Sequence, residues 1–105
     1  MSNYCIITTA CNKEGVANNI VNTLLKKRLV SCCQMSNIQS TYWWKGKIEK
    51  EPEIFIQMKT RKELYNEVEA EILKLHDYET CEILSYDIEQ GNKDYLNWID
   101  EDTKK

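Results

Sequence analysis

Hydrophobic and polar positions alternate along two long neighbouring segments, residues 31–44 and 47–60, which are separated only by Lys45-Gly46. A two-residue loop with glycine in second place is typical of a tight β-hairpin. A shift of one residue would move every side chain of an arm to the opposite face, so the pattern favours one register. That register places apolar residues opposite one another: Cys33 and Met58, Met35 and Ile56, Trp43 and Ile48.

The apolar pattern of the first arm changes phase between Met35 and Ile38. An extra residue in one strand of an antiparallel pair produces such a change. The sequence therefore predicts a bulge or a bend near Ser36-Asn37.

Two further strands flank the hairpin in the sequence. Residues 4–9 are rich in β-branched and aromatic side chains and predict a buried first strand. Residues 82–89 have the same character and predict a fourth strand, which Gly91-Asn92 ends.

Three segments have apolar residues at helical spacing. The first runs from an Asn12 cap to about Arg28. The second follows Thr60 and Glu63, whose spacing is that of a capping box, and its apolar face consists of Leu64, Val68, Ile72 and Leu75. The third is a short helix capped by Asn92, with apolar residues Tyr95, Leu96, Trp98 and Ile99.

The order of the elements is β-α-β-β-α-β-α, which indicates an α+β fold. We expect a ferredoxin-like βαββαβ sandwich with a long hairpin between its second and third strands and an extra C-terminal helix. The chain has 105 residues, and we expect residues 1–105 to form one domain.

The hairpin is too long for the rest of the domain to cover. Each arm of 14 residues extends about 45 Å, whereas a helix of about 15 residues covers about 22 Å. Half of the hairpin, with Tyr42, Trp43 and Trp44, therefore protrudes, and exposed aromatic strands of this kind pair with other chains. We expect a symmetric oligomer. In the alternative interpretation, the charged and proline residues of the hairpin keep neighbouring molecules apart: Lys45, Lys47, Lys50 and Pro52.

Composition excludes several classes of partner. The net charge is −3 and the isoelectric point is about 5.2, which argues against nucleic-acid binding because that needs a basic face. The sequence contains neither an apolar run long enough for a membrane span nor an N-terminal pattern typical of a signal peptide. We expect no nucleic-acid partner, no membrane association and a cytoplasmic location.

The candidate chemistry gathers around His76, the only histidine. It is followed by Asp77, Cys81 and Glu82, and a histidine, thiol and carboxylate so close in sequence form a candidate transition-metal site. The alternative is a histidine that only caps the second helix. The five cysteines match no zinc signature, and adjacent Cys32 and Cys33 point to opposite faces of a strand, so buried free thiols explain them better.

Several motifs together resemble the CutA family of divalent-cation tolerance proteins, over about residues 4–102. They are Thr9-Ala10, Arg28-Leu29-Val30-Ser31-Cys32, Tyr42-x-Trp44-x-Gly46-Lys47, Lys59-Thr60, His76-x-Tyr78-Glu79 with Glu82-Ile83, and Gly91-Asn92-x-x-Tyr95-Leu96-x-Trp98. Each motif is weak alone, but their order and spacing are specific.

The resemblance implies a homotrimer of ferredoxin-like subunits that pair their hairpins, similar to PII signalling proteins. It implies tolerance of copper and other divalent metals, no enzymatic activity, and a sensor or adaptor role. The cleft of the family between subunits corresponds to Trp44, Lys59, His76, Tyr78, Glu82 and Tyr95 of this chain. The candidate metal ligands here are His76, Cys81 and Glu82, for copper or zinc.

The chain departs from the family pattern at several of these positions. Ala10-Cys11-Asn12 replaces an alanine-proline-aspartate sequence, Asp77 and Cys81 replace prolines, and Thr8 replaces a cysteine that is a copper ligand in some bacterial members. One alternative is therefore a structural or adaptor trimer that binds a protein partner without a metal. An acylphosphatase-like enzyme, which shares the sheet order, is the least favoured because the glycine-rich phosphate loop is missing.

Overall fold

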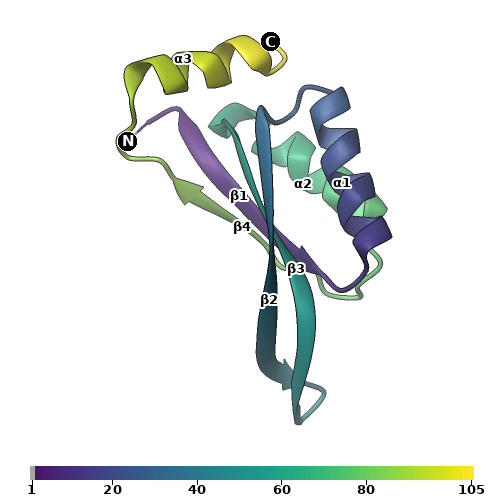
Figure 1. Cartoon of the computed structure of the whole chain (residues 1–105). Helices are drawn as coiled ribbons and strands as arrows, with labels where there is room; N and C mark the ends of the chain where they lie inside the picture. The colour runs from purple at the N-terminus through teal and green to yellow at the C-terminus, as the bar shows by residue number, and fades with distance from the viewer. Residues whose placement is uncertain (1) are drawn as a thin grey trace.

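The computed structural model describes residues 2–105 and contains four strands and three α-helices (Figure 1). Their order confirms the expected α+β fold. The elements are β1 (Tyr4–Cys11), α1 (Glu14–Lys26), β2 (Cys32–Trp44), β3 (Lys47–Arg61), a short 3-10 turn (Lys62–Leu64), α2 (Tyr65–Leu75), β4 (Ile83–Asp87) and α3 (Lys93–Asp102).

The strands form one antiparallel sheet in the order β2-β3-β1-β4. Helices α1 and α2 cover one face of this sheet, and α3 lies across its end (Figure 1). The core lies between the sheet and the two helices. Its buried side chains include Ile7 of β1, Ile20 and Leu24 of α1, Met58 of β3 and Ile72 of α2. Burial of this apolar surface is the main force that holds the sheet and helices together.

The hairpin has the register that the sequence predicts. Cys33 pairs with Met58, Met35 with Ile56 and Trp43 with Ile48. Lys45 and Gly46 have φ angles of 50° and 81°. Positive φ at both loop positions is the conformation of a type I′ turn, whose twist matches that of the flanking strands.

Of the bulge or bend expected near Ser36-Asn37, the bulge is absent from the structure. Pairing runs without interruption from Cys32 and Lys59 to Trp44 and Lys47, so residues 32–44 contain no bulge. The phase of the apolar pattern changes because the two faces of the strand have different surroundings. Met35 lies on the helix-covered face with its partner Ile56, whereas Ile38 lies on the other face with its partner Glu53.

Half of the hairpin protrudes, as expected. Strand β1 pairs with β3 only as far as Cys11 and Ile54, so residues 38–53 extend beyond the sheet (Figure 1). The molecule measures 44 × 26 × 22 Å as a result. At the end of the hairpin, the exposed fraction reaches 72% for Trp43 and 59% for Ile48.

Two of the expected helix caps are wrong, because both side chains bind elsewhere. Asn12 precedes α1 by two positions and donates to the Glu51 carboxylate at 3.4 Å. Thr60 belongs to β3, and its buried hydroxyl donates to the Leu29 carbonyl at 2.6 Å. The chain then forms a 3-10 turn before α2 begins at Tyr65.

The expected cap of the last helix is confirmed. The Asn92 side chain accepts a hydrogen bond from the Tyr95 amide at 3.1 Å, which satisfies a free N–H group of the first turn. Ile99 is fully buried and anchors α3. Beyond the helix, the Thr103 hydroxyl accepts from Nε of Arg61 at 2.8 Å.

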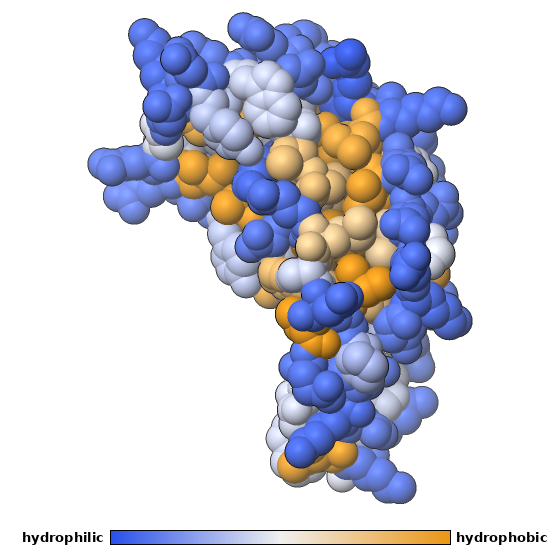
Figure 2. Space-filling view, viewed as in Figure 1, coloured by the Kyte–Doolittle hydropathy of each residue, from blue (hydrophilic) through white to orange (hydrophobic). Residues whose placement is uncertain are grey.

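Helix α3 packs on one end of the second face of the sheet, where Tyr4 binds Asp100 and Arg61 binds Thr103; within residues 2–105, no helix lies over the rest of this face. Paired residues share a face, so Ile6, Phe55, Leu84 and Tyr86 lie together on this side. Leu84 and Tyr86 are 46% and 52% exposed. Apolar atoms also gather in the middle of the view in Figure 2, above the protruding hairpin. None of the helices in residues 2–105 combines the length and the hydropathy that a membrane span needs.

Candidate functional site

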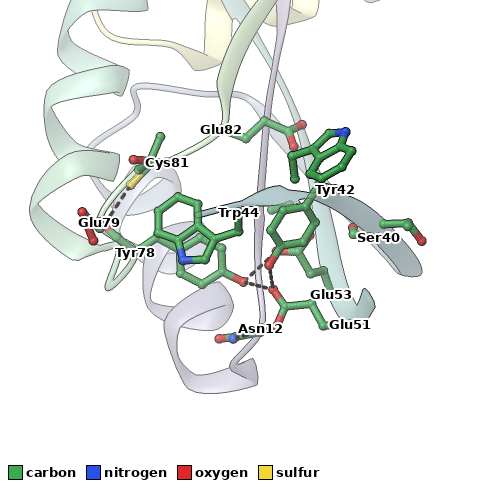
Figure 3. A pocket seen from close by; sticks show the side chains of 14 residues that line it. Asn12, Ser40, Tyr42, Trp44, Glu51, Glu53, Tyr78, Glu79, Cys81 and Glu82 are labelled. Atoms are coloured by element: carbon green, nitrogen blue, oxygen red, sulfur yellow. Dashed lines mark hydrogen bonds between the residues drawn. The ribbon is translucent and has the colours of Figure 1, made fainter. Parts of the chain in front are cut away.

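A cavity of about 720 Å³ lies where the hairpin leaves the sheet, beneath the loop that joins α2 to β4 (Figure 3). Side chains from β1, β2, β3 and that loop meet there. The lining residues are Ala10, Asn12, Ser40, Thr41, Tyr42, Trp43, Trp44, Glu51, Glu53, Tyr78, Glu79, Thr80, Cys81 and Glu82.

The hairpin register brings the first pair of functional groups together. Tyr42 pairs with Glu49, and Glu51 lies two residues further along β3 on the same face. Diagonal neighbours of this kind are within reach of long side chains. The Tyr42 hydroxyl donates to Glu51 at 2.6 Å.

The loop after α2 supplies the second pair. The Tyr78 hydroxyl donates to Glu53 at 2.6 Å and lies 3.5 Å from Glu51. Glu53 is only 8% exposed. Figure 3 shows the phenolic ends of Tyr42 and Tyr78 converging on the two carboxylates. The inner wall of the cavity is thus a network of phenols and carboxylates.

Both phenols of this network have raised pKa values. The hydrogen bond to Glu51 is the main cause that raises the pKa of Tyr42 to about 12. Burial and the hydrogen bond to Glu53 raise the pKa of Tyr78 well above its usual value. Both hydroxyls therefore remain hydrogen-bond donors at neutral pH, and the carboxylates remain their acceptors.

Lys45, in the hairpin turn, does not line the cavity but contacts two residues that do. Its Nζ atom lies 5.5 Å from the centre of the Trp44 ring and 3.8 Å from the Glu79 carboxylate. An ammonium group at this distance from an indole is attracted by the negative face of the ring.

His76 has its side chain fully buried beside the cavity. Its Nε2 lies 2.8 Å from the Ala10 carbonyl oxygen, and its Nδ1 accepts from the Tyr78 amide at 3.2 Å. A neutral imidazole protonated at Nε2 satisfies both contacts. The histidine therefore fastens the loop to β1, and neither nitrogen is free for a metal ion.

Cys81 and Glu82, the other two expected metal ligands, line the cavity. The Cys81 thiol donates to the Tyr78 carbonyl at 3.6 Å, and burial raises the pKa of that thiol. Within residues 2–105, no group of three or more histidine, cysteine, aspartate or glutamate side chains is placed to hold a metal ion. His76, Cys81 and Glu82 are therefore not gathered around one point in this chain.

The expected cleft residues fall into two groups. Trp44, Tyr78 and Glu82 line the cavity. Lys59 and Tyr95 lie outside it: Lys59 donates to Gln34, and Tyr95 packs against Trp98 with ring centres 5.4 Å apart. Burial and the neighbouring Cys32 thiol raise the pKa of Tyr95.

Glu51 and Glu53, the central carboxylates of the site, were not among the residues expected from the sequence. They resemble ordinary charged residues on an exposed strand. The predicted hairpin register could have identified Glu51, because that register places Glu51 diagonally opposite Tyr42.

Comparison with known proteins identifies the family. The family model described as "CutA1 divalent ion tolerance protein" matches residues 5–102. The chain belongs to the CutA1 divalent ion tolerance family. The CutA protein of Pyrococcus horikoshii is 42% identical over 89 residues, which cover 85% of this chain and 87% of that protein. The CutA protein of Archaeoglobus fulgidus is 41% identical over 101 residues, covering 96% and 97%.

Solved CutA structures have the same fold. The crystal structure of P. horikoshii CutA1 superposes with a TM-score of 0.92 at 38% identity, covering 96% of this chain and 99% of that one. The structure of A. fulgidus CutA, described as a periplasmic divalent cation tolerance protein, has a TM-score of 0.93 at 37% identity, with the same coverage. The names of these CutA relatives describe cation tolerance rather than an enzymatic reaction.

Proposed function

We propose that this CutA family member is a homotrimer that binds a divalent cation or a small effector in clefts between its subunits and acts without catalysis. The observation that carries the proposal is the apolar sheet face around Leu84 and Tyr86, together with the protruding hairpin. The sheet face and the end of the hairpin with Trp43 and Ile48 expose apolar side chains that neighbouring copies can cover. In such a trimer, the hairpin of each chain covers apolar surface of a neighbouring chain.

The division of the expected cleft residues supports a site between subunits. Tyr95 lies on α3 at one end of the molecule, whereas Trp44 lies near the turn of the hairpin at the other end (Figure 1). One chain cannot bring these residues together. A neighbour whose hairpin reaches past α3 places its own Trp44 beside Lys59 and Tyr95.

A copper or zinc ion in such a cleft needs ligands from two chains. Cys81 and Glu82 supply a soft and a hard donor at the cavity, and a neighbouring copy must supply the rest, because His76 is already satisfied. The names of the relatives support cation tolerance as the biological role. A PII-like sensor in the cytoplasm is the form of this role that we propose.

Zinc titration by calorimetry tests the proposal on the purified protein, with sedimentation equilibrium to measure its mass. We expect a trimer that binds zinc, and at least tenfold weaker binding in Cys81→Ser and Glu82→Gln. Glu101→Gln, an exposed change on α3, is the control. A trimer that binds no zinc would favour the alternative of an adaptor for a protein partner.

A further inference from the structure

The cavity has the chemistry of a site for an organic cation. Four aromatic side chains and four glutamates line it, and within residues 2–105 no lysine, arginine or histidine belongs to the lining. We propose that the cavity binds a primary alkylammonium compound. Its ammonium group is held at Glu51 and Glu53, and its alkyl chain lies along Trp44. The inference goes beyond the proposed function: it concerns the cavity that one chain lines, and it depends neither on a metal nor on the trimer.

Glu53 provides the first argument. The side chain is among the most buried charged groups of the protein, yet its Oε2 accepts only the neutral Tyr78 hydroxyl. Within residues 2–105, its other oxygen, Oε1, forms no hydrogen bond, and it is accessible from the cavity. A carboxylate oxygen at a cavity wall, with no positive side chain beside it, is an available acceptor for a cation. An ammonium ion in the cavity supplies both the missing charge and the missing donor.

Lys45 provides the second, independent argument. Its Nζ atom lies outside the lining but contacts two lining residues, the Trp44 ring at 5.5 Å and the Glu79 carboxylate at 3.8 Å. The chain thus places one of its own alkylammonium groups against this wall. Aromatic and carboxylate groups that accept the lysine also suit a free amine of the same chemistry.

A small hydrated metal ion fits this inner wall less well. Glu51 and Glu53 already accept hydrogen bonds from Tyr42 and Tyr78, so this wall offers fewer open oxygens than the roughly six that surround a hard divalent ion. The aromatic rings provide no ligand for a metal ion that retains its hydration shell. They do attract an ammonium group that is attached to an apolar chain.

Calorimetric titration with n-butylammonium chloride, at constant ionic strength, tests the proposal. We expect saturable binding at millimolar concentration, weaker binding of magnesium chloride, and no binding of n-butanol, which has the same alkyl chain without the charge. Equal binding of butanol and butylammonium, or no binding of butylammonium, would overturn the proposal.

Three variants locate the site. Glu53→Gln keeps the acceptor for Tyr78 but removes the charge, and we expect butylammonium affinity to fall at least tenfold. Trp44→Leu should weaken binding about fivefold through the lost ring. Lys45→Gln should strengthen binding about two- to threefold, because it removes a competing ammonium group. Glu101→Gln is the matched control, and unchanged affinity in the first three variants would refute the assignment.

The Lys45→Gln result does not depend on a buried residue, so it remains informative if Glu53→Gln folds poorly. Sedimentation and zinc titration of the same samples separate the two proposals. A zinc-binding trimer without butylammonium binding removes only the ammonium site. A single chain that binds butylammonium keeps the ammonium site and removes the trimer.

Discussion

The imidazole Nε2 of His76 lies 2.8 Å from the carbonyl oxygen of Ala10, and this contact ties the loop after α2 to the central strand β1. The other ring nitrogen accepts from the Tyr78 amide at 3.2 Å. The same loop carries Tyr78 into the cavity, where it binds Glu53. His76 does not line the cavity, but it holds the loop in the position that places Tyr78 there.

Replacement of His76 by alanine tests this positioning role. The change leaves the Ala10 carbonyl and the Tyr78 amide without partners in a buried place, and we expect a loss of about 2 kcal/mol in the free energy of unfolding. Urea denaturation measures it. Asp77→Ala, which removes an exposed ion pair with Lys13, should cost less than about 1 kcal/mol. A stable His76→Ala protein that has lost only zinc binding would instead indicate a metal ligand.

The hairpin turn provides the second prediction. Gly46 has a φ of 81°, which is unfavourable for a residue with a Cβ atom, so Gly46→Ala should destabilise the protein by about 1 kcal/mol. Lys45 has a φ of 50°, and asparagine is preferred at this position of a type I′ turn. Lys45→Asn should therefore raise the midpoint of thermal unfolding. The turn assignment is wrong if both changes have the same sign.

Thr60 provides the third prediction. Its buried hydroxyl donates to the Leu29 carbonyl, and Thr60→Val keeps the shape but leaves that carbonyl unpaired. We expect a cost of about 1–2 kcal/mol in urea denaturation. Thr41→Val, on the exposed part of the hairpin, is the matched control and should change stability by less than about 0.5 kcal/mol. Equal effects of the two changes would contradict the role of the Thr60 hydroxyl.

Acid provides the fourth prediction. Lys13 holds the pKa of Asp77 below its usual value, and Lys27 does the same for Glu71. The unfolded chain therefore binds protons at higher pH than the folded one. The two ion pairs contribute their full stability above about pH 4, where both carboxylates are ionised even in the unfolded chain. The contribution is lost as the pH falls through the lower pKa values that Asp77 and Glu71 have in the folded protein.

Replacement of Lys13 by methionine should make the loss of stability below about pH 4 less steep in urea denaturation. Lys93→Met changes an exposed lysine that forms no ion pair within residues 2–105, and it should leave the acid slope as in the wild type. Identical slopes for all three proteins would show that the Asp77 pair contributes nothing.

The sequence predicts the elements and the hairpin register because these depend on local patterns. Lys45-Gly46 set the turn, and alternation along both arms fixed the pairing. The caps at Asn12 and Thr60 were wrong because Glu51 and Leu29, which are distant in sequence, compete for those side chains. Local spacing does not reveal such tertiary partners.

The candidate site was predicted less well than the fold, for the same reason. Trp44, Tyr78, Cys81 and Glu82 do line one cavity. The surroundings of His76 depend on a carbonyl 66 positions away in the sequence, so its two hydrogen bonds are invisible in the local motif. Burial of Glu53 likewise results from the loop that folds over it.

Sedimentation equilibrium at micromolar concentration tests the central claim, that the long hairpin and the uncovered sheet face are completed by other copies of the chain. We expect three times the chain mass of 12.4 kDa for the wild type. Tyr86→Lys, which places a charge on the uncovered face, should shift the protein toward single folded chains. A wild-type protein that is well folded at the mass of one chain would contradict the account.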